Sequence, residues 1–347
     1  MPILSTTAES LPQTMIRLSY VAVLSVLLTD IWIAPPAFAD NVSAPMAARV
    51  ISTFKVRSNE TRFGPFEFVG GLELDSHNPL FGAVSSIRFR ADGRQFLSVL
   101  DTGHWLSGTI ERDAKGRLSG IADATIAPML DATARSPRSK SAVDAEGLAL
   151  RHGQAIVSFE QRHRIDVYPD PGFEASKPLR TIPLLVDRNQ LRANGGLETL
   201  AISPPDSALA GAMVIVAEKS VDENGFLLAA VVDGPNKGTF SVVSDKPFDV
   251  TDGAFLPDGD LLLLERRFNL SSGIGMRIRR IQGTDIRPGA VVNGEVLLEA
   301  DSHYQIDNME GLDVIAGPDG KPHVILVSDD NHSIFQRSLM LEFKLVE

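Results

Sequence analysis

The sequence predicts an all-β fold, a β-propeller, and three observations support this prediction. A pattern of strand, tight turn and strand recurs five times, with its copies centred near residues 86, 147, 199, 253 and 311. Repeats of this length built from short strands are typical of propeller blades. Apolar residues in the copies alternate or form short runs, whereas helical repeats would space them three and four residues apart. Because a four-stranded blade takes roughly 50 residues, the part of the chain after residue 39 has room for about six blades, and we expect six.

The clearest copy of the repeat runs from Asp144 to Glu160. Acidic residues open its first apolar strand, residues 151–153 form a turn, and a second apolar run ends in Glu160. The same order recurs along the chain. The acids near the starts of first strands are Glu146, Glu198, Asp252 and Glu310, and those at the ends of second strands are Asp101, Glu160, Glu218, Glu265 and Asp329.

The other strands are predicted from alternation and from the turn residues between them. Residues 51–69 alternate and predict one or two strands, and part of the sixth blade is expected within residues 41–74. Further strands are expected at 107–112, 117–122, 164–168, 225–232, 238–243, 276–281 and 291–298. A last strand at 339–346 is expected to complete the first blade and so close the ring.

The N-terminus has the pattern of a signal peptide over residues 1–39. Residues 18–33 are mainly apolar, and residues 37–39 before Asp40 fit a signal-peptidase site. The first residues carry no positive charge, so Met15, which is followed by an arginine, is a candidate true initiator.

An uncleaved membrane anchor is the alternative, which Asp30 within the apolar segment disfavours. We therefore expect a periplasmic or secreted protein with no stable membrane anchor after cleavage. Residues 40–50 are expected to be a flexible lead and residues 51–347 a single propeller domain.

The composition restricts the possible functions. The chain has 44 acidic against 33 basic residues, a formal net charge of −11, which is unfavourable for binding nucleic acid. It has no cysteine, which excludes disulfides and thiolate catalysis. It also has no Gly-x-Ser-x-Gly or His-Glu-x-x-His sequence, and its seven histidines are scattered, which argues against a zinc site.

The acids of the repeat are expected to meet at one face of the propeller. In antiparallel neighbours, the start of one strand and the end of the next lie at the same rim. So many carboxylates repel one another unless cations neutralise them, and hard oxygen ligands suit calcium or magnesium. The alternative is structural, with the acids bonding backbone N–H groups and pairing with arginines between blades. The basic or amide residues that follow the same strand ends are His104, Arg162, His163, Lys219, Arg266, Arg267, Asn331 and His332.

Several segments together resemble the phytase-like family of exported bacterial proteins, described as having esterase-like activity. They include Asp101-Thr102-Gly103-His104-Trp105, Asp144-Ala145-Glu146-Gly147-Leu148, Ser158-Phe159-Glu160-Gln161-Arg162, Asn194-Gly195-Gly196-Leu197-Glu198, Leu264-Glu265-Arg266-Arg267-Phe268, Asn308-Met309-Glu310-Gly311-Leu312 and Ser328-Asp329-Asp330-Asn331. The resemblance extends from about Phe68 to the C-terminus. It implies a β-propeller and calcium-dependent hydrolysis of a phosphoester or carboxyester.

Two functional hypotheses follow. In the first, the protein is an exported metal-dependent hydrolase of a small ester or phosphoester, and Ca²⁺ is its cofactor. The expected catalytic acids are Glu146, Glu160, Glu265 and Glu310. The expected substrate-binding residues are Arg162, Arg266, Arg267, His104 and Asn331, and the expected metal ligands are Glu198, Asp329 and Asp330. In the second, the propeller binds a ligand or a protein without catalysis.

Overall fold

The structure, a computed structural model, describes residues 41–136, 140–269 and 273–346, so the predicted signal peptide lies outside the described residues. Within these ranges the chain is built of strands, with one short helix, α1 (Lys140–Val143), and three single-turn 3-10 helices. No helix in this part of the chain is both long and apolar enough to cross a membrane.

The described strands form five sheets, each counted here as one blade from its innermost strand outward. Blade 1 contains β5 (Val84–Phe89), β6 (Gln95–Leu100), β7 (His104–Arg112), β8 (Leu118–Pro128) and β1 (Val42–Ser43). Blade 2 contains β9 (Ala145–Arg151), β10 (Gln154–Phe159), β11 (Arg164–Pro169) and β12 (Arg180–Ile182). Blade 3 contains β13 (Leu197–Ile202), β14 (Met213–Val221), β15 (Leu227–Val231), β16 (Gly238–Val242) and β20 (Val291–Val292). Blade 4 contains β17 (Asp249–Phe255), β18 (Leu261–Asn269), β19 (Gly273–Ile281) and β21 (Glu295–Asp301). Blade 5 contains β22 (Asn308–Ala316), β23 (Pro322–Asp329), β24 (Ser338–Leu345), β4 (Phe66–Asp75) and β2 (Ala47–Ile51), with β3 (Arg62–Phe63) paired to β4.

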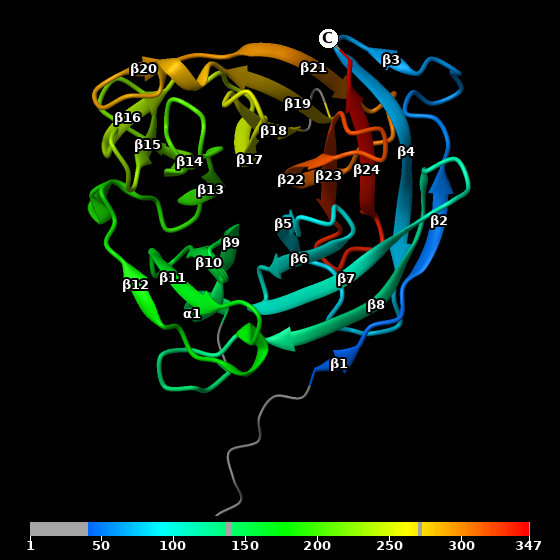
Figure 1. Cartoon of the computed structure of the whole chain (residues 1–347), viewed down its shortest axis with the longest axis horizontal. Coiled ribbons are helices and arrows are strands. Elements are labelled where there is room, and N and C mark those ends of the chain that lie inside the picture. The colour runs from blue at the N-terminus through cyan, green and yellow to red at the C-terminus, as the bar shows by residue number, and fades with distance from the viewer. Residues whose placement is uncertain (1–40, 137–139, 270–272, 347) are drawn as a thin grey trace, which may run out of the picture. The chain divides into compact units, whose positions relative to one another are not determined.

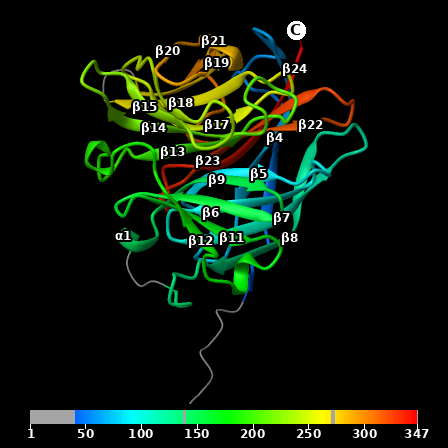
Figure 2. The same cartoon turned by 60° about the vertical axis from the view of Figure 1, so that its left-hand side comes forward.

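The five innermost strands close into a ring. Going round it, β5 contacts β9, β9 contacts β13, β13 contacts β17, β17 contacts β22, and β22 contacts β5. Figures 1 and 2 show the sheets set around this common centre. The prediction of an all-β propeller is confirmed, and each predicted copy of the repeat forms the two inner strands of one blade.

The expected sixth blade is not formed, because residues 41–75 join existing sheets instead. β1 pairs with β8 at the outer edge of blade 1, while β4 pairs with β24 and β2 pairs with β4 in blade 5. The ring is therefore closed by an N-terminal strand added to the last blade, and not by the C-terminal strand completing the first. The segment expected to be a flexible lead contains strands instead, since β1 and most of β2 lie before residue 51.

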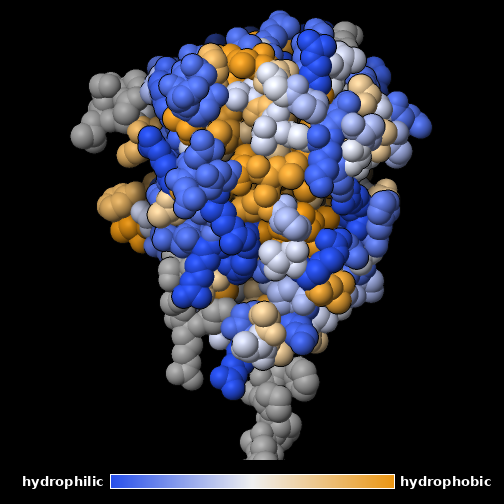
Figure 3. Space-filling view, turned by 90° about the vertical axis from the view of Figure 1, so that its left-hand side faces the viewer, coloured by the Kyte–Doolittle hydropathy of each residue, from blue (hydrophilic) through white to orange (hydrophobic). Residues whose placement is uncertain are grey.

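Apolar alternation in the strands is explained by five hydrophobic clusters, one between each pair of neighbouring blades. Successive side chains of a strand face opposite neighbours, so both sides of a blade must be apolar for the blades to pack. The side that carries β12, β16 and β20 shows hydrophobic side chains at its centre with hydrophilic ones around them (Figure 3). The packed blades hold the inner strands, and hence their polar ends, in fixed positions.

Candidate functional site

Each inner strand carries an irregularity at the same position, one or two residues from its start. In four blades the inner strand has one extra residue there: Ser85, Glu198, Thr251 and Glu310 in blades 1, 3, 4 and 5. In blade 2, Glu146 and Gly147 lie opposite Ser158 alone. A β-bulge redirects the side chain of the extra residue away from the regular alternation. The repeated bulge therefore explains why Glu146, Glu198 and Glu310 take equivalent places in their blades.

These three glutamates line a polar cavity of about 520 Å³ at one end of the ring. The residues lining this acidic cavity are Ser85, Asp101, Asp144, Glu146, Gln161, Asn194, Glu198, Glu218, Lys219, Arg266, Glu310, Asp329 and Asn331. They come from all five blades, as expected for acids at strand starts and strand ends. Only two of the lining residues, Lys219 and Arg266, carry positive charge, so the cavity is strongly negative when its acids are ionised.

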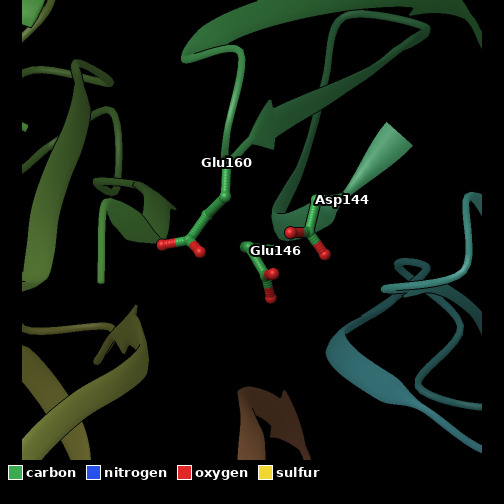
Figure 4. A group of neighbouring side chains, drawn as sticks. All are labelled: Asp144, Glu146 and Glu160. Atoms are coloured by element: carbon green, nitrogen blue, oxygen red, sulfur yellow. The ribbon is translucent and has the colours of Figure 1, made fainter. Parts of the chain in front are cut away.

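Two groups of carboxylates lie close enough to share a cation. Asp144, Glu146 and Glu160 offer one oxygen each within 4.8 Å of one another, and so do Glu160, Glu198 and Glu218. Figure 4 shows the carboxylates of the first group turned toward a common space. Glu160 belongs to both groups, which makes it the centre of the acidic arrangement.

A glycine turn fixes the carboxylate of Glu160. Its Oε1 accepts a hydrogen bond from the N–H of Gly195 at 2.7 Å and another from the N–H of Gly196. Gly195 has φ of 104°, a conformation that residues with a side chain rarely adopt, and a Cβ at Gly196 would collide with the ring of His163. Burial raises the pKa of Glu160, while these two backbone donors oppose the rise.

Glu146 and Glu198 both lie among other carboxylates in the cavity. Burial raises the pKa of both carboxyls well above the ordinary value, and repulsion from the neighbouring carboxylates raises it further. Neither side chain has a hydrogen bond or salt bridge to another described residue, although the charge of Arg266 acts on Glu198 from a greater distance. Two carboxylates without such partners fit a site whose charge is completed by a cation.

Arg266 joins three blades at the cavity wall. Its Nε and Nη2 lie 3.2 and 3.1 Å from the two oxygens of Glu310, and Nη2 lies 3.5 Å from Glu218 Oε1. Burial raises the pKa of Glu310 to about 7 although Arg266 opposes it. Burial also raises the pKa of Asp329 to about 6. Burial lowers the pKa of Arg266, but the surrounding carboxylates outweigh it and the net pKa is raised, so this arginine stays charged.

Three acids that the sequence suggested for this face are not among the residues that line the cavity. Glu160 is only 1% exposed and is close to the lining acids without lining the cavity itself. Glu265 is buried between blades 3 and 4, where its oxygens pair with Arg277 and Arg279. It precedes Arg266 in β18, and strand alternation places the two side chains on opposite faces of blade 4. Asp252 is fully buried and forms an ion pair with Arg88 at 2.7 Å. In blade 4 the bulge falls on Thr251, one residue earlier than the repeat suggested, so Asp252 keeps the regular alternation.

Four other predicted site residues also lie off the cavity lining. Arg162 lines a separate depression of about 400 Å³ beside blade 2. Arg267 lies over the ring of Phe248. His104 Nδ1 is 3.0 Å from the hydroxyl of Thr102, and burial lowers its pKa. The carboxylate of Asp330 accepts hydrogen bonds from the Ser338 hydroxyl and the His332 N–H, which holds the loop after β23.

The structure adds lining residues that the sequence did not assign to the site: Ser85, Asp144, Gln161 and Asn194. Asp144 was available as the head of the clearest repeat, and Asn194 precedes the glycine pair. Ser85 occupies the bulge position of a blade without an acid there, so no charge pattern could have identified it.

Comparison with protein families matches residues 79–332 to the family described as "Phytase-like: Esterase-like activity of phytase". Comparison with curated protein sequences finds no match. Among solved structures, an oxidoreductase described as a glucose dehydrogenase from Thermus thermophilus is 14% identical, with a TM-score of 0.38, over 85% of this chain and 100% of that chain. Two further glucose dehydrogenases are 10% identical, with TM-scores of 0.40 and 0.39, over 80% and 75% of this chain and 98% and 96% of theirs. These likenesses are remote, and the five-bladed architecture rests on the strand pairing itself.

Proposed function

The chain belongs to the phytase-like family, and from this premise and the acidic cavity we propose that it is a metal-dependent hydrolase of phosphoester or carboxyester bonds. The observation that carries the proposal is the pair of carboxylates Glu146 and Glu198, which form no hydrogen bond or salt bridge in the described part of the chain and lie among further acids. Their charge repels that of their neighbours, so keeping these residues together costs stability unless a cation is bound.

The ligand set proposed for the metal is Asp144, Glu146, Glu160, Glu198 and Glu218. All five offer carboxylate oxygens, the donors that calcium prefers, and several acids together suit its high and flexible coordination number. Bound calcium would neutralise these acids and polarise the oxygens of an ester group. The glycine turn keeps Glu160 in place, because both of its N–H groups donate to one carboxylate oxygen, and Glu160 lies within reach of the other acids of both groups.

For the chemistry, we assign Glu310 as the general base and Arg266 as the anion-binding residue. Glu310 has a pKa of about 7, so it can take a proton from an attacking water near neutral pH. The permanent charge of Arg266 beside it attracts the phosphate oxygens of a phosphoester, or the carbonyl oxygen of a carboxyester as it gains negative charge. Water adds to the phosphorus or carbonyl carbon while Glu310 takes its proton; the bond to the ester oxygen breaks, and Glu310 returns the proton to that oxygen, so an alcohol leaves and Glu310 is ionised again. Asp329 and Asn331 line the wall next to Glu310 and are proposed to position the substrate.

The second candidate is a propeller that binds a ligand without catalysis. It is favoured by Glu265 and Asp252, because these show that acids of the same repeat can act purely as ties between blades. The two functions differ in turnover. Hydrolysis of aryl phosphates and aryl acetates is measured with the mature protein in calcium and in EDTA. The hydrolase requires calcium-dependent turnover that Glu146→Gln abolishes without unfolding the protein, whereas the binding module has no turnover.

We also propose export through the N-terminal signal sequence. N-terminal sequencing of the protein recovered from the periplasm or medium should give Asp40 as the first residue. An N-terminus that begins at Met1 or Met15 would contradict cleavage.

A further inference from the structure

We propose that the protein has a second binding site at the other end of the ring, where a pocket lined by Asp313 and apolar residues takes a primary alkylammonium group. This second pocket lies where the inner strands end, whereas the acidic cavity lies where they start. It has a volume of about 190 Å³ and is lined by two consecutive residues from each of the five inner strands. Cavities of roughly 150 Å³ bind molecules as small as benzene, so the second pocket suits a group of about six non-hydrogen atoms.

The repeat explains the shape of the second pocket. The first lining residue of each strand lies three positions after the bulge, and these residues are Arg88, Ala149, Ala201, Ala254 and Asp313. The residues that follow them are large and apolar, and they are Phe89, Leu150, Ile202, Phe255 and Val314. Because three blades carry alanine at the first position, space is left at the centre of the ring. Arg88 and Asp313, the charged members of the lining, come from neighbouring blades, since β5 contacts β22.

Arg88 separates the second pocket from the acidic cavity. Its Nη1 donates to Asp252 Oδ2 at 2.8 Å, and its Nη2 donates to Asp252 Oδ1 at 2.7 Å. The same two nitrogens also donate to backbone carbonyls of blades 1, 3, 4 and 5. A side chain from blade 1 therefore spans the channel and is bonded on its far side. The two cavities share no lining residue, so the second pocket is a site of its own and does not depend on hydrolysis in the acidic cavity.

The charge of Asp313 is not balanced by a direct ion pair. Both Nη atoms of Arg88 pair with Asp252, and in the described part of the chain no basic side chain forms a salt bridge with Asp313. Asp313 Oδ2 accepts a hydrogen bond from the Phe89 N–H at 2.6 Å, and the Val314 N–H also donates to this carboxylate. A carboxylate has about four acceptor positions, so it can still accept from a ligand. Burial raises the pKa of Asp313 to about 6, although Arg88 and the two backbone donors oppose the rise.

These features favour a ligand with a positive charge at one end and an apolar body. Arg88, Asp252 and Asp313 together carry a net charge of one negative unit when ionised, which a single cation completes. A primary ammonium group supplies this charge and three N–H donors for the free acceptor positions of Asp313. Its alkyl chain would contact the apolar wall, where each methylene removed from water gives roughly a fourfold gain in affinity. A carboxylate ligand would instead bring a second negative charge beside Asp313.

The test measures binding of methylammonium, butylammonium and butyrate by calorimetry, in excess calcium so that amines compete poorly for the acidic cavity. We expect wild type to bind butylammonium at least about tenfold more tightly than methylammonium, and to bind no butyrate. Asp313→Asn keeps the shape of the side chain and should weaken butylammonium binding at least about tenfold. The matched control is Asp307→Asn, which neutralises a similarly buried carboxylate outside both cavities and should keep the wild-type affinity.

A second variant tests the apolar wall without changing a charge. Ile202 is half-buried at the pocket, so Ile202→Ser should fold, and it should reduce the preference for butylammonium over methylammonium at least about threefold. This variant decides the matter if Asp313→Asn fails to fold. The alkylammonium group can belong to a free amine or to a lysine side chain of another protein, and Nα-acetyl-lysine methylamide distinguishes the two. Tighter binding of this derivative than of butylammonium identifies a lysine side chain, the reverse order identifies a free amine, and both support the site.

Absence of butylammonium binding, equal affinity for the two amines, or binding of butyrate as tight as that of butylammonium would overturn the inference. So would an unchanged butylammonium affinity in Asp313→Asn, or an unchanged chain-length preference in Ile202→Ser. Loss of binding in Glu146→Gln with retention in Asp313→Asn would place the amine in the acidic cavity and would also overturn it.

Discussion

Replacing Glu198 with glutamine should have opposite effects on the metal-free and the calcium-bound protein. The glutamine keeps the size of the side chain and removes its charge. In the metal-free protein this relieves repulsion, so we expect the free energy of unfolding to rise. In calcium it removes a ligand, so we expect the calcium dissociation constant to increase at least about tenfold.

The size of the first effect follows from the distances in the cavity. Glu198 has a carboxylate oxygen within 4.8 Å of oxygens of Glu160 and Glu218. At an effective dielectric constant of about 20, two charges at this distance repel by about 3 kcal/mol. Burial and repulsion raise the pKa of Glu198, so part of this repulsion is already relieved by protonation. We therefore expect Glu198→Gln to stabilise the metal-free protein at pH 8 by about 1–3 kcal/mol.

The assay is urea unfolding at pH 8, in EDTA and in calcium, with Glu342→Gln as the matched control. Glu342 is as deeply buried, but it accepts hydrogen bonds from Arg112 at 2.7 and 2.9 Å and lies 2.7 Å from His323 Nδ1. Its replacement leaves the partly buried Arg112 without its carboxylate partner and should destabilise the protein by about 3–5 kcal/mol in both conditions. If Glu198→Gln also destabilises the metal-free protein, Glu198 is a structural acid and the reasoning is wrong.

Three further predictions concern the arginines and the pH dependence. Arg266→Gln should raise KM for anionic substrates at least about tenfold, measured by steady-state kinetics, and an unchanged KM would remove Arg266 from substrate binding. Asp252→Asn should lower the free energy of unfolding by about 3–5 kcal/mol, because Arg88 loses its buried partner, yet leave calcium affinity unchanged in calorimetry. The pKa values of Glu310 and Asp329, about 7 and about 6, lie above those of an unfolded chain, so the metal-free folded state holds extra protons. Its stability should therefore fall as pH rises from about 5 to 8, and urea midpoints that increase over this range would contradict the assignment.

The propeller and much of the cavity could be predicted from the sequence because the repeat places the same residue type at the same point of each blade. Glu146, Glu198 and Glu310 were found this way, and they line the cavity together. Glu265 and Asp252 fit the same charge pattern, but their side chains do not line the cavity. Their orientation depends on strand alternation and on a one-residue difference in the position of a bulge, which the charge pattern does not reveal.

The number of blades could not be predicted from the repeat alone. The copies are 52 to 61 residues apart, longer than a minimal blade, because they include outer connections such as the segment with β20. Residues 41–75 carry strand patterns that suit a separate blade equally well. Only their pairing partners β8 and β24, distant in sequence, decide that they extend blades 1 and 5.

The most direct test of the proposed function is a calcium titration of the mature protein in which heat of binding and rate of ester hydrolysis are recorded over the same concentrations. We predict that calcium binds and that turnover rises with the same midpoint. Glu146→Gln should lose both responses, while Asp252→Asn should keep them. Absence of calcium binding up to millimolar concentration, or turnover that EDTA leaves unchanged, would contradict a metal-dependent hydrolase.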